Sequence, residues 1–303
     1  MDAPGLVSSW SDQELAQLAA TVRRGTPWRQ ALHGVTQPAA PGERIEHRAD
    51  EAHGNWLWLV DLARWERALD VQGGIGTMTA ALARHFTSVH YLDAARPPLE
   101  FARARFSEDR SANVACAQAG AGALPYRDAT FDCVVWDGAL GRSVSGVATA
   151  DPPAVLGAVL AECRRVLRPG GCLYVGIATG PVPGQVLPAG RVLSALVQMV
   201  IRVSRFLPLW TWRRRATMQV RRVERLAVAR ALPRQLRAAG FARVEAYYVA
   251  PSFQQPWSII PARRRAVLAF ERLQMTNATQ RRWLAWLSLH PVLFECHMFL
   301  AYA

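Results

Sequence analysis

One stretch constrains the fold more than any other. In residues 67–80, RALDVQGGIGTMTA, an apolar run ends in a glycine cluster that is followed by small, helix-forming residues. This pattern is typical of a buried strand that enters a tight turn at the start of a helix. Glycines let the turn approach a ligand closely, and the helix N-terminus offers free N–H groups. We therefore expect a ligand-binding turn at residues 72–76, with Gln72 standing where the first glycine usually lies.

Strand-like and helix-like segments alternate around this turn. We expect strands at residues 67–71, 88–94, 113–119, 131–137 and 172–177, and helices at 77–86, 97–106 and 152–167. A helix, a glycine turn and a strand follow at 232–250, and a last strand at 295–303. Such alternation predicts a parallel, doubly wound α/β sheet. Ligands bind these sheets at the carboxyl ends of the strands, where the strand order reverses.

Four parts are expected along the chain. Residues 1–65 form an N-terminal helical cap, in which 11–24 and 55–64 are helical and the proline- and glycine-rich stretch 26–44 is a loop. Residues 66–180 form the core that carries the glycine turn. Residues 181–230 form an amphipathic helical insertion, and residues 231–303 complete the core around a second helical insertion at 251–293.

The residues downstream of the turn indicate which ligand it holds. A nicotinamide or flavin turn carries a third glycine where this chain has Thr79. Asp93 ends the second strand, and the stretches LPYRDATFD (124–132) and RRVLRPGG (164–171) follow. Together with LDVQGGIG (69–76), they resemble the motifs of class I S-adenosylmethionine-dependent methyltransferases over roughly residues 66–178. The set is most similar to the group that acts on quinones, sterols and natural products.

This resemblance implies a Rossmann-like sheet of seven mostly parallel strands, with helices on both faces and two helical insertions. It also implies S-adenosylmethionine as the cofactor. The methionine half would be held by Asp70 and the turn residues Gln72, Gly73, Gly74 and Gly76; Asp93 would bind the ribose, Ala94, Gly120 and Ala121 would surround the adenine, and Trp136 and Asp137 would line the methyl-transfer cavity. The chain departs from the family at Gln72, a glycine in most members, and at Gly120, often an acid. Both departures predict weaker binding of the cofactor.

The motifs contain no obvious catalytic base and no metal-ligand cluster. Methyl transfer from a sulfonium depends mainly on positioning, and a base is required only for acceptors such as a hydroxyl group. His53 and Tyr126 are the candidates for that role. We expect O-methylation of a small hydrophobic or amphiphilic acceptor, with C- or N-methylation as the alternatives.

The C-terminal part is strongly basic. The chain has 36 basic and 23 acidic residues, and residues 181–303 hold acids only at Glu224, Glu245, Glu271 and Glu295. Such a field favours an anionic partner, although a solvated basic surface explains it equally well. In residues 190–210, polar residues recur at helical spacing on an otherwise apolar segment. The segment 190–215 is therefore expected to form a lid over an apolar substrate or to lie on a membrane surface.

Two further functions stay open. The basic C-terminal part suggests RNA methylation, although its arginines are interleaved with Leu, Val and Trp and no RNA-binding module is evident. Gln72 and Gly120 suggest a methyltransferase-like binding or assembly subunit that has lost catalysis. The five cysteines form no disulfide pattern and no secretory signal is evident, so we expect a cytoplasmic protein, with peripheral contact at the inner membrane surface as a second expectation.

Overall fold

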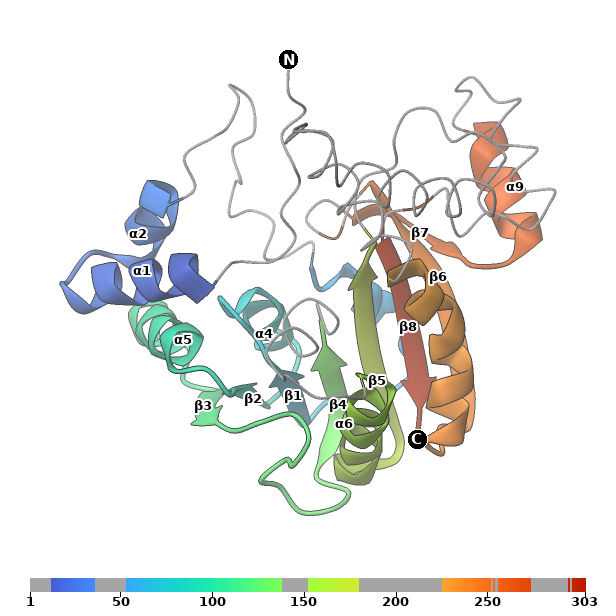
Figure 1. Ribbon diagram of the computed structural model, residues 1–303, viewed down its shortest axis with the longest axis horizontal. Helices are drawn as coiled ribbons and strands as arrows, with labels where there is room; N and C mark the ends of the chain where they lie inside the picture. Colours follow the sequence, from blue (N-terminus) through green and yellow to red (C-terminus); the bar gives the residue numbers. More distant parts are fainter. Residues whose placement is uncertain are drawn as a thin grey trace, which may run out of the picture.

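The computed structural model describes residues 12–35, 53–137, 152–179, 225–251, 253, 256–273, 294 and 296–303. These residues contain one sheet of eight strands in the order β3-β2-β1-β4-β5-β8-β6-β7 (Figure 1). The strands are β1 (Arg67–Val71), β2 (Ser88–Asp93), β3 (Val114–Gln118), β4 (Phe131–Trp136), β5 (Leu167–Ala178), β6 (Arg243–Pro251), β7 (Pro256–Pro261) and β8 (Cys296–Tyr302).

The first five strands run parallel to one another. Strand β8 is antiparallel to both β5 and β6, and β7 is antiparallel to β6. The chain moves outward from β1 to β3 and then returns to the other side of β1 with β4. The strand order therefore reverses between β1 and β4, and the expected Rossmann-like α/β fold is confirmed with eight strands instead of seven.

Helices cover both faces of the sheet. They are α1 (Asp12–Arg23), α2 (Trp28–Val35), the 3-10 helix η1 (Asn55–Leu59), α4 (Thr77–Leu82), α5 (Arg96–Glu108), α6 (Pro152–Val166), a helix at 225–238 and α9 (Arg264–Leu273). Successive side chains of a strand point to opposite faces, so Val134 and Trp136 of β4 enter one core cluster while Cys133 and Val135 enter the other. The first cluster includes residues of α6 and of the helix at 225–238, and the second includes residues of η1 and α4.

The eighth strand is β7, which lies at one edge of the sheet within the segment 251–293 that was expected to be a helical insertion. Prolines occupy its first and last positions, and such residues are tolerated at a sheet edge because they need not donate to a ladder on both sides. Ile259 and Ile260 between them favour an extended chain. Among the residues of this segment that the structure describes, α9 meets the helical expectation.

Two N-terminal expectations are wrong in detail. The stretch expected to be a loop contains α2, in which the spacing of Trp28, Ala31 and Leu32 buries one helical face. In the stretch 55–64, only the five residues of η1 are helical, because the chain is already extended at Val60.

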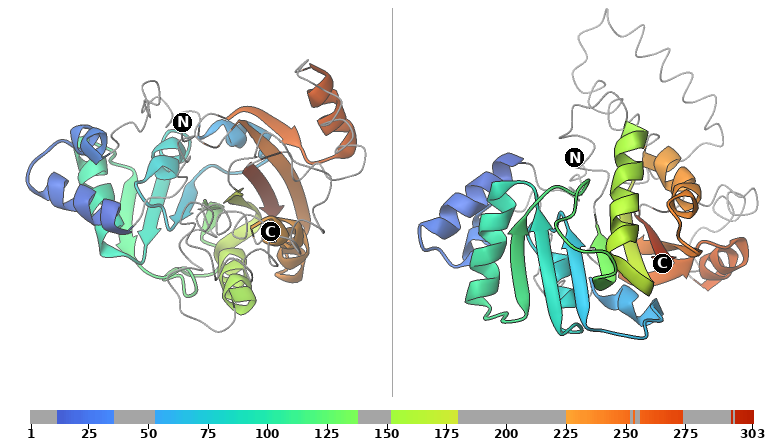
Figure 2. Two further views of the ribbon diagram at one scale, coloured as in Figure 1. Left: turned by 45° about the horizontal axis from the view of Figure 1, so that its top comes forward. Right: turned by 90° about the horizontal axis from the view of Figure 1, so that it is seen from below.

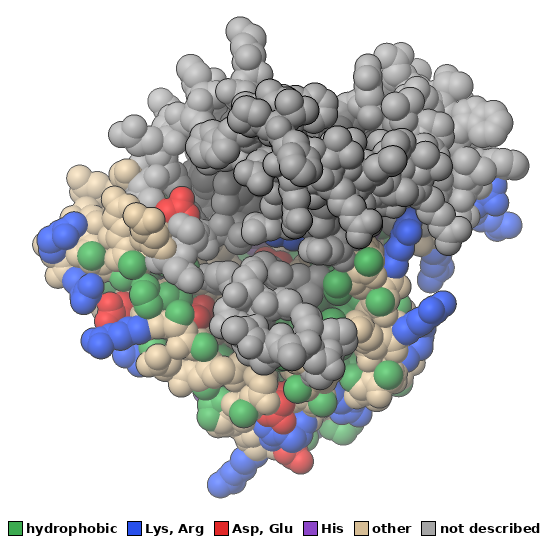
Figure 3. Space-filling model, in the orientation of Figure 1, with side chains coloured by type: hydrophobic (Ala, Val, Ile, Leu, Met, Phe, Trp, Pro, Cys, Tyr) green, Lys and Arg blue, Asp and Glu red, His purple; other side chains and the backbone are tan. Residues whose placement is uncertain are grey.

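Within the described ranges, no helix is long and apolar enough to cross a bilayer. The segment 190–215, predicted to be a lid or a membrane-surface helix, lies outside these ranges. The basic C-terminal part is represented by arginines exposed on the helix at 225–238 and at the start of α9, namely Arg230, Arg234, Arg237, Arg263, Arg264 and Arg265. Basic side chains are visible along the border of the surface drawn in Figure 3.

Candidate functional site

The glycine turn lies at the carboxyl ends of β1 and β2, where the strand order reverses. Gln72, Gly74 and Gly76 have positive φ angles of 58°, 59° and 77°. The backbone N–H groups of Gln72 and Gly73 donate to the carbonyl of Leu92 at 2.6 and 3.2 Å, which fastens the turn to β2. Gly76 is the N-cap of α4, so the free N–H groups of that helix face this edge of the sheet.

Gly73 has no space for a larger side chain. A Cβ atom there would lie 2.5 Å from the ring of Tyr91 and 2.9 Å from Oδ2 of Asp70. The Tyr91 hydroxyl donates to the carbonyl of Gly74 at 2.7 Å, so Tyr91 of β2 both packs against the turn and is hydrogen-bonded to it. The turn therefore needs glycine at position 73 for packing and tolerates a side chain at position 72.

Gln72 turns its side chain toward the end of β4. Its Oε1 accepts a hydrogen bond from Nε1 of the buried Trp136 at 3.0 Å. A left-handed conformation costs a residue with a side chain about 1 kcal/mol or more, and a hydrogen bond of this kind stabilises the fold by about 1 kcal/mol. The bond to Trp136 therefore offsets the strain that Gln72 introduces.

Two buried acids flank the turn. Asp93, at the end of β2, is 4% exposed and accepts hydrogen bonds from the N–H groups of Gly74 at 3.3 Å and Ala95 at 3.0 Å. Asp70, in β1, is 1% exposed and accepts a hydrogen bond from the Thr79 hydroxyl at 2.5 Å. Ala94, after Asp93, is exposed at the edge.

The pKa of Asp70 is raised to about 7, mainly by burial; the nearby carboxylates of Asp137 and Asp93 act in the same direction, and the hydrogen bond from Thr79 acts against them. Asp93 and Asp137 are thus close enough to Asp70 at the carboxyl edge to act on its charge. A site with this charge favours a cationic ligand, because a positive charge placed there relieves the mutual repulsion.

The third acid depends on a glycine in the neighbouring strand. The register between β4 and β5 pairs Trp136 with Val175, which brings Asp137 beside Gly176. A Cβ atom on Gly176 would overlap the Asp137 carboxylate and would lie 3.2 Å from the Tyr174 hydroxyl oxygen. Burial, together with the Asp137 charge, raises the pKa of Tyr174 well above its usual value, so this phenol keeps its proton.

The loop after β3 borders the site on another side. The Ala119 N–H donates to the Asp93 carbonyl at 3.2 Å, so the loop starts next to the end of β2. Gly120 is exposed, and a Cβ atom there would meet nothing within 4 Å, whereas Ala121 is buried. The predicted adenine neighbours therefore lie beside Asp93 and Ala94.

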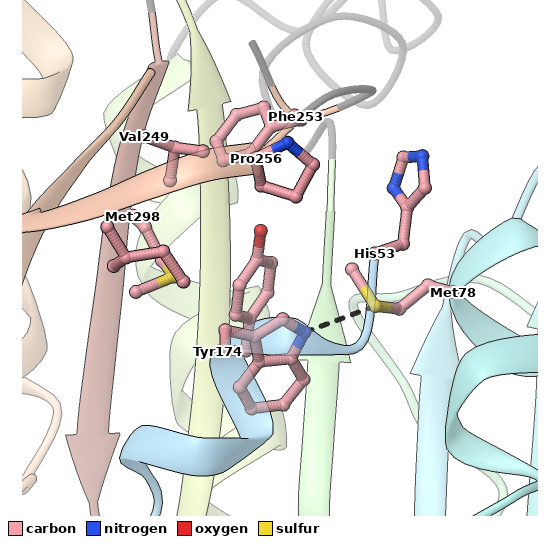
Figure 4. Close-up of a pocket in the computed structure, with 9 residues that line it drawn as sticks. His53, Met78, Tyr174, Val249, Phe253, Pro256 and Met298 are labelled. Atoms are coloured by element: carbon pink, nitrogen blue, oxygen red, sulfur yellow. Dashed lines mark hydrogen bonds between the residues drawn. The ribbon is translucent and has the colours of Figure 1, made fainter. Parts of the chain in front are cut away.

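His53 lies at a small apolar pocket on the α4 side of the sheet, together with Trp56, Met78, Tyr174, Phe253 and Met298 (Figure 4). In Figure 4, the Tyr174 hydroxyl points toward Phe253 and Pro256, and the Trp56 indole donates to the Met78 sulfur at 3.4 Å. Met78 belongs to the first turn of α4, so the pocket adjoins the helix that follows the glycine turn.

The second candidate base, Tyr126, lies elsewhere. Its ring packs edge-to-face against His90 and against Phe131, the first residue of β4. Five residues of extended strand, about 17 Å, separate Phe131 from Trp136 at the carboxyl edge. The structure therefore places the predicted cofactor residues at the carboxyl edge and His53 at the pocket beside α4, but it places Tyr126 at the opposite end of β4.

Sequence reasoning missed Thr79, Tyr174 and Gly176. Thr79 was considered only as a missing glycine, although a hydroxyl three residues after the N-cap can reach back to the preceding strand. Tyr174 and Gly176 gave no signal, because only the register of β5 on β4 brings them to Asp137. No group of three or more potential metal ligands occurs in the part of the chain that the structure describes.

Comparisons with known proteins point to one family. Residues 69–175, which include the turn, Asp93 and Trp136, match the family model described as "Methyltransferase domain". A demethylmenaquinone methyltransferase of Clavibacter sepedonicus is 33% identical over 155 residues, which are 48% of this chain and 58% of that protein. The chain therefore spans less than two thirds of the length of this curated relative.

Among solved structures, phosphoethanolamine N-methyltransferase 2 of Haemonchus contortus, in complex with phosphomonomethylethanolamine and S-adenosylhomocysteine, is 15% identical. That match covers 98% of this chain and 59% of the other, with a TM-score of 0.46. An S-adenosylmethionine-dependent methyltransferase of Aquifex aeolicus is also 15% identical, with 67% of this chain and 87% of the other covered and a TM-score of 0.44.

Proposed function

We propose that this chain, whose residues 69–175 are a class I S-adenosylmethionine-dependent methyltransferase domain, binds that cofactor at the carboxyl edge and methylates a small apolar acceptor. The observation that carries the proposal is the set of three acids around the glycine turn. When bound, S-adenosylmethionine supplies an electrophilic methyl group on a cationic sulfonium. Asp70, Asp93 and Asp137 surround the turn with negative charge that complements such a cation.

The proposed roles follow from position. Asp93, held by the Gly74 and Ala95 N–H groups, presents a fixed carboxylate to a ribose diol. The turn residues Gln72, Gly73, Gly74 and Gly76, with Asp70 behind them, hold the methionine half. Ala94, Gly120 and Ala121 border the adenine. Trp136, whose indole donates to Gln72, and Asp137 line the methyl-transfer cavity.

The pocket beside α4 is the proposed acceptor site. Its walls are aromatic and sulfur-containing side chains, whose chemistry matches an apolar, planar ring, and the small space between them would have to widen to admit one. The name of the Clavibacter relative agrees with this chemistry, so a quinone-like ring in its reduced, hydroxylated form is the proposed acceptor. The acceptor atom is proposed to be oxygen, with carbon or nitrogen as the alternatives.

Two polar groups at this pocket suit such a ring. Tyr174 keeps its proton and can donate a hydrogen bond to an acceptor oxygen, which orients the ring. Asp137, next to it across Gly176, is the carboxylate placed to accept a proton from a hydroxyl group. His53 also lies at the pocket and stays a candidate for the same role.

The test is transfer of a labelled methyl group from S-adenosylmethionine. The full chain is given a short-chain hydroquinone in detergent, phospholipid vesicles or an RNA transcript, and label is measured in each product. We expect label in the hydroquinone, and lower turnover in Tyr174→Phe with unchanged binding of S-adenosylhomocysteine. Product analysis then identifies the methylated atom.

The other outcomes contradict the proposal in different ways. Label in RNA alone would favour nucleic-acid methylation. Binding of S-adenosylhomocysteine without transfer to any of the three acceptors would favour a binding or assembly subunit. If S-adenosylhomocysteine does not bind at millimolar concentration, the assignment of S-adenosylmethionine as the cofactor is wrong.

A further inference from the structure

The N-terminal helices pack on the glycine turn as well as on the sheet's covering helix. Leu15, Leu18, Trp28 and Leu32 form a buried cluster with Phe101 of α5, and Ile75 of the turn packs against that cluster. The views in Figures 1 and 2 agree in placing α1 and α2 beside α5. Ile75 lies between Gly74 and Gly76, so the N-terminal helices contact the backbone segment assigned to the cofactor.

Trp28, the first residue of α2, is held tightly at the end of α5. Its backbone N–H donates to Oε2 of Glu108 at 3.0 Å, and its indole Nε1 donates to Oδ1 of Asp109 at 3.1 Å. The guanidinium of Arg105 lies 4.4 Å from the centre of its ring, within the range of a cation–π interaction. Trp28 and Arg105 are buried, whereas the carboxylates of Glu108 and Asp109 that hold Trp28 lie at the exposed end of α5.

Arg105 joins this tryptophan to the turn. Its side chain is 1% exposed, and its Nη1 donates to the carbonyl of Ile75 at 2.8 Å. On the other side of the same peptide group, the Gly76 N–H donates to the Gly73 carbonyl at 2.9 Å. Both the carbonyl and the N–H group of the peptide between residues 75 and 76 are therefore hydrogen-bonded. The donor to the carbonyl is Arg105, a buried cation stacked on Trp28.

We propose that Arg105 is a positioning residue for the cofactor turn and that Trp28, through Arg105, makes cofactor binding depend on docking of the N-terminal helices. The inference rests on the proposed cofactor site. The turn has positive φ angles at both glycines that flank Ile75, so without this support it has many conformations to sample. Ordering the turn before the ligand arrives removes that cost from binding.

The chain offers a matched control. Trp65 is a second tryptophan, partly buried where Trp28 is fully buried, and it packs on a core aromatic ring, Phe86, with 5.0 Å between ring centres. It precedes β1 and so lies at the amino edge of the sheet, away from the turn. Trp28→Ala and Trp65→Ala both remove an indole from the fold, but only the first removes the support of Arg105.

The experiment measures binding of S-adenosylhomocysteine by calorimetry and hydrogen exchange of residues 72–76 in the ligand-free chain. We expect Trp28→Ala and Arg105→Gln to weaken binding about tenfold and to speed exchange in the turn, whereas Trp65→Ala lowers thermal stability and changes neither. Trp28→Phe keeps the ring over Arg105 and is expected to restore most of the affinity. Asp109→Ala, a milder loss at the end of α5, replaces Trp28→Ala if that variant does not fold.

The two readouts separate the inference from the proposed function. If the parent chain does not bind S-adenosylhomocysteine, the cofactor assignment fails, and exchange of the turn still decides whether Trp28 and Arg105 order it. If folded Trp28→Ala binds as tightly as the parent and its turn exchanges no faster than that of Trp65→Ala, the N-terminal helices do not position the turn.

Discussion

Asp70 illustrates how a functional residue conflicts with stability. The carboxyl group is buried beside two other acids, which raises its pKa to about 7, so the folded protein keeps a proton that the unfolded chain releases near pH 4. Asp70 therefore lowers the free energy of unfolding as the pH rises from about 4 to about 7. A buried ionisable side chain that lowers stability is expected at a functional position and not at a purely structural one.

Asp70→Asn should stabilise the protein at pH 8 while weakening the cofactor site. The amide oxygen can still accept the Thr79 hydrogen bond, and no charge remains to be buried. We expect a gain of roughly 4 kcal/mol at pH 8 relative to the parent, with a smaller gain at pH 5. Thermal unfolding at several pH values checks this; an advantage that does not grow with pH would show that Asp70 is not the buried acid responsible.

The two predicted loop glycines should respond differently to a methyl group. In Gly73→Ala, the new Cβ would press on the Tyr91 ring and Asp70, so the turn must move and binding of S-adenosylhomocysteine should weaken about tenfold or more. In Gly120→Ala, the Cβ meets nothing, so folding and binding should be close to those of the parent. Equal affinities of the two variants for S-adenosylhomocysteine would show that the turn does not contact the ligand.

At the scale of elements, α6 fixes the loop that borders the site. Arg165 donates to the carbonyls of Leu124 at 3.0 Å and Tyr126 at 2.8 Å, and it is held by Glu162 at 2.7 Å. Glu162 in turn accepts from the Leu124 N–H at 2.8 Å. Arg165 belongs to the stretch RRVLRPGG, and the carbonyls to which it donates belong to LPYRDATFD. The first stretch therefore holds the second in place through these hydrogen bonds.

Arg165→Ala should loosen residues 120–128. Removing the guanidinium leaves two carbonyls without this donor, which should cost about 2 kcal/mol of stability and speed hydrogen exchange in that loop. Arg164→Ala is the matched control, because toward the described residues the Arg164 side chain donates one hydrogen bond, to the Gly240 carbonyl at 3.2 Å, and none to the loop 120–128. Similar exchange in the two variants would rule out α6 as the fastening element.

Sequence reasoning succeeded for elements whose pattern is local and failed for those that depend on partners. Strand β1, the turn and α4 follow from one continuous stretch. The sequence predicts a loop where α2 lies, because prolines and glycines surround the buried positions Trp28, Ala31 and Leu32. Strand β7 has six residues, of which the first and the last are prolines, and its pairing with β6 makes it a strand.

For the whole molecule, the cofactor site could be predicted from local sequence patterns, whereas the acceptor site depends on contacts between distant segments. Asp93 was predictable because the end of a strand next to a glycine turn must face the ligand edge. The arrangement of Asp137, Gly176 and Tyr174 was not, because it follows from the register of β4 on β5. The coupling through Arg105 needs α2, α5 and the turn together, and no single stretch of sequence contains it.

The central claim, that the carboxyl edge binds S-adenosylmethionine through Asp93, is tested most directly by calorimetric titration of the full chain with S-adenosylhomocysteine. Asp93→Asn keeps an oxygen for the Gly74 and Ala95 N–H groups but loses the charge, and Asp61→Asn, at an exposed acid, is the control. We predict binding to the parent and to Asp61→Asn, and binding at least about tenfold weaker to Asp93→Asn. Equal affinity in all three proteins, or no binding to the parent at millimolar ligand, would contradict the account.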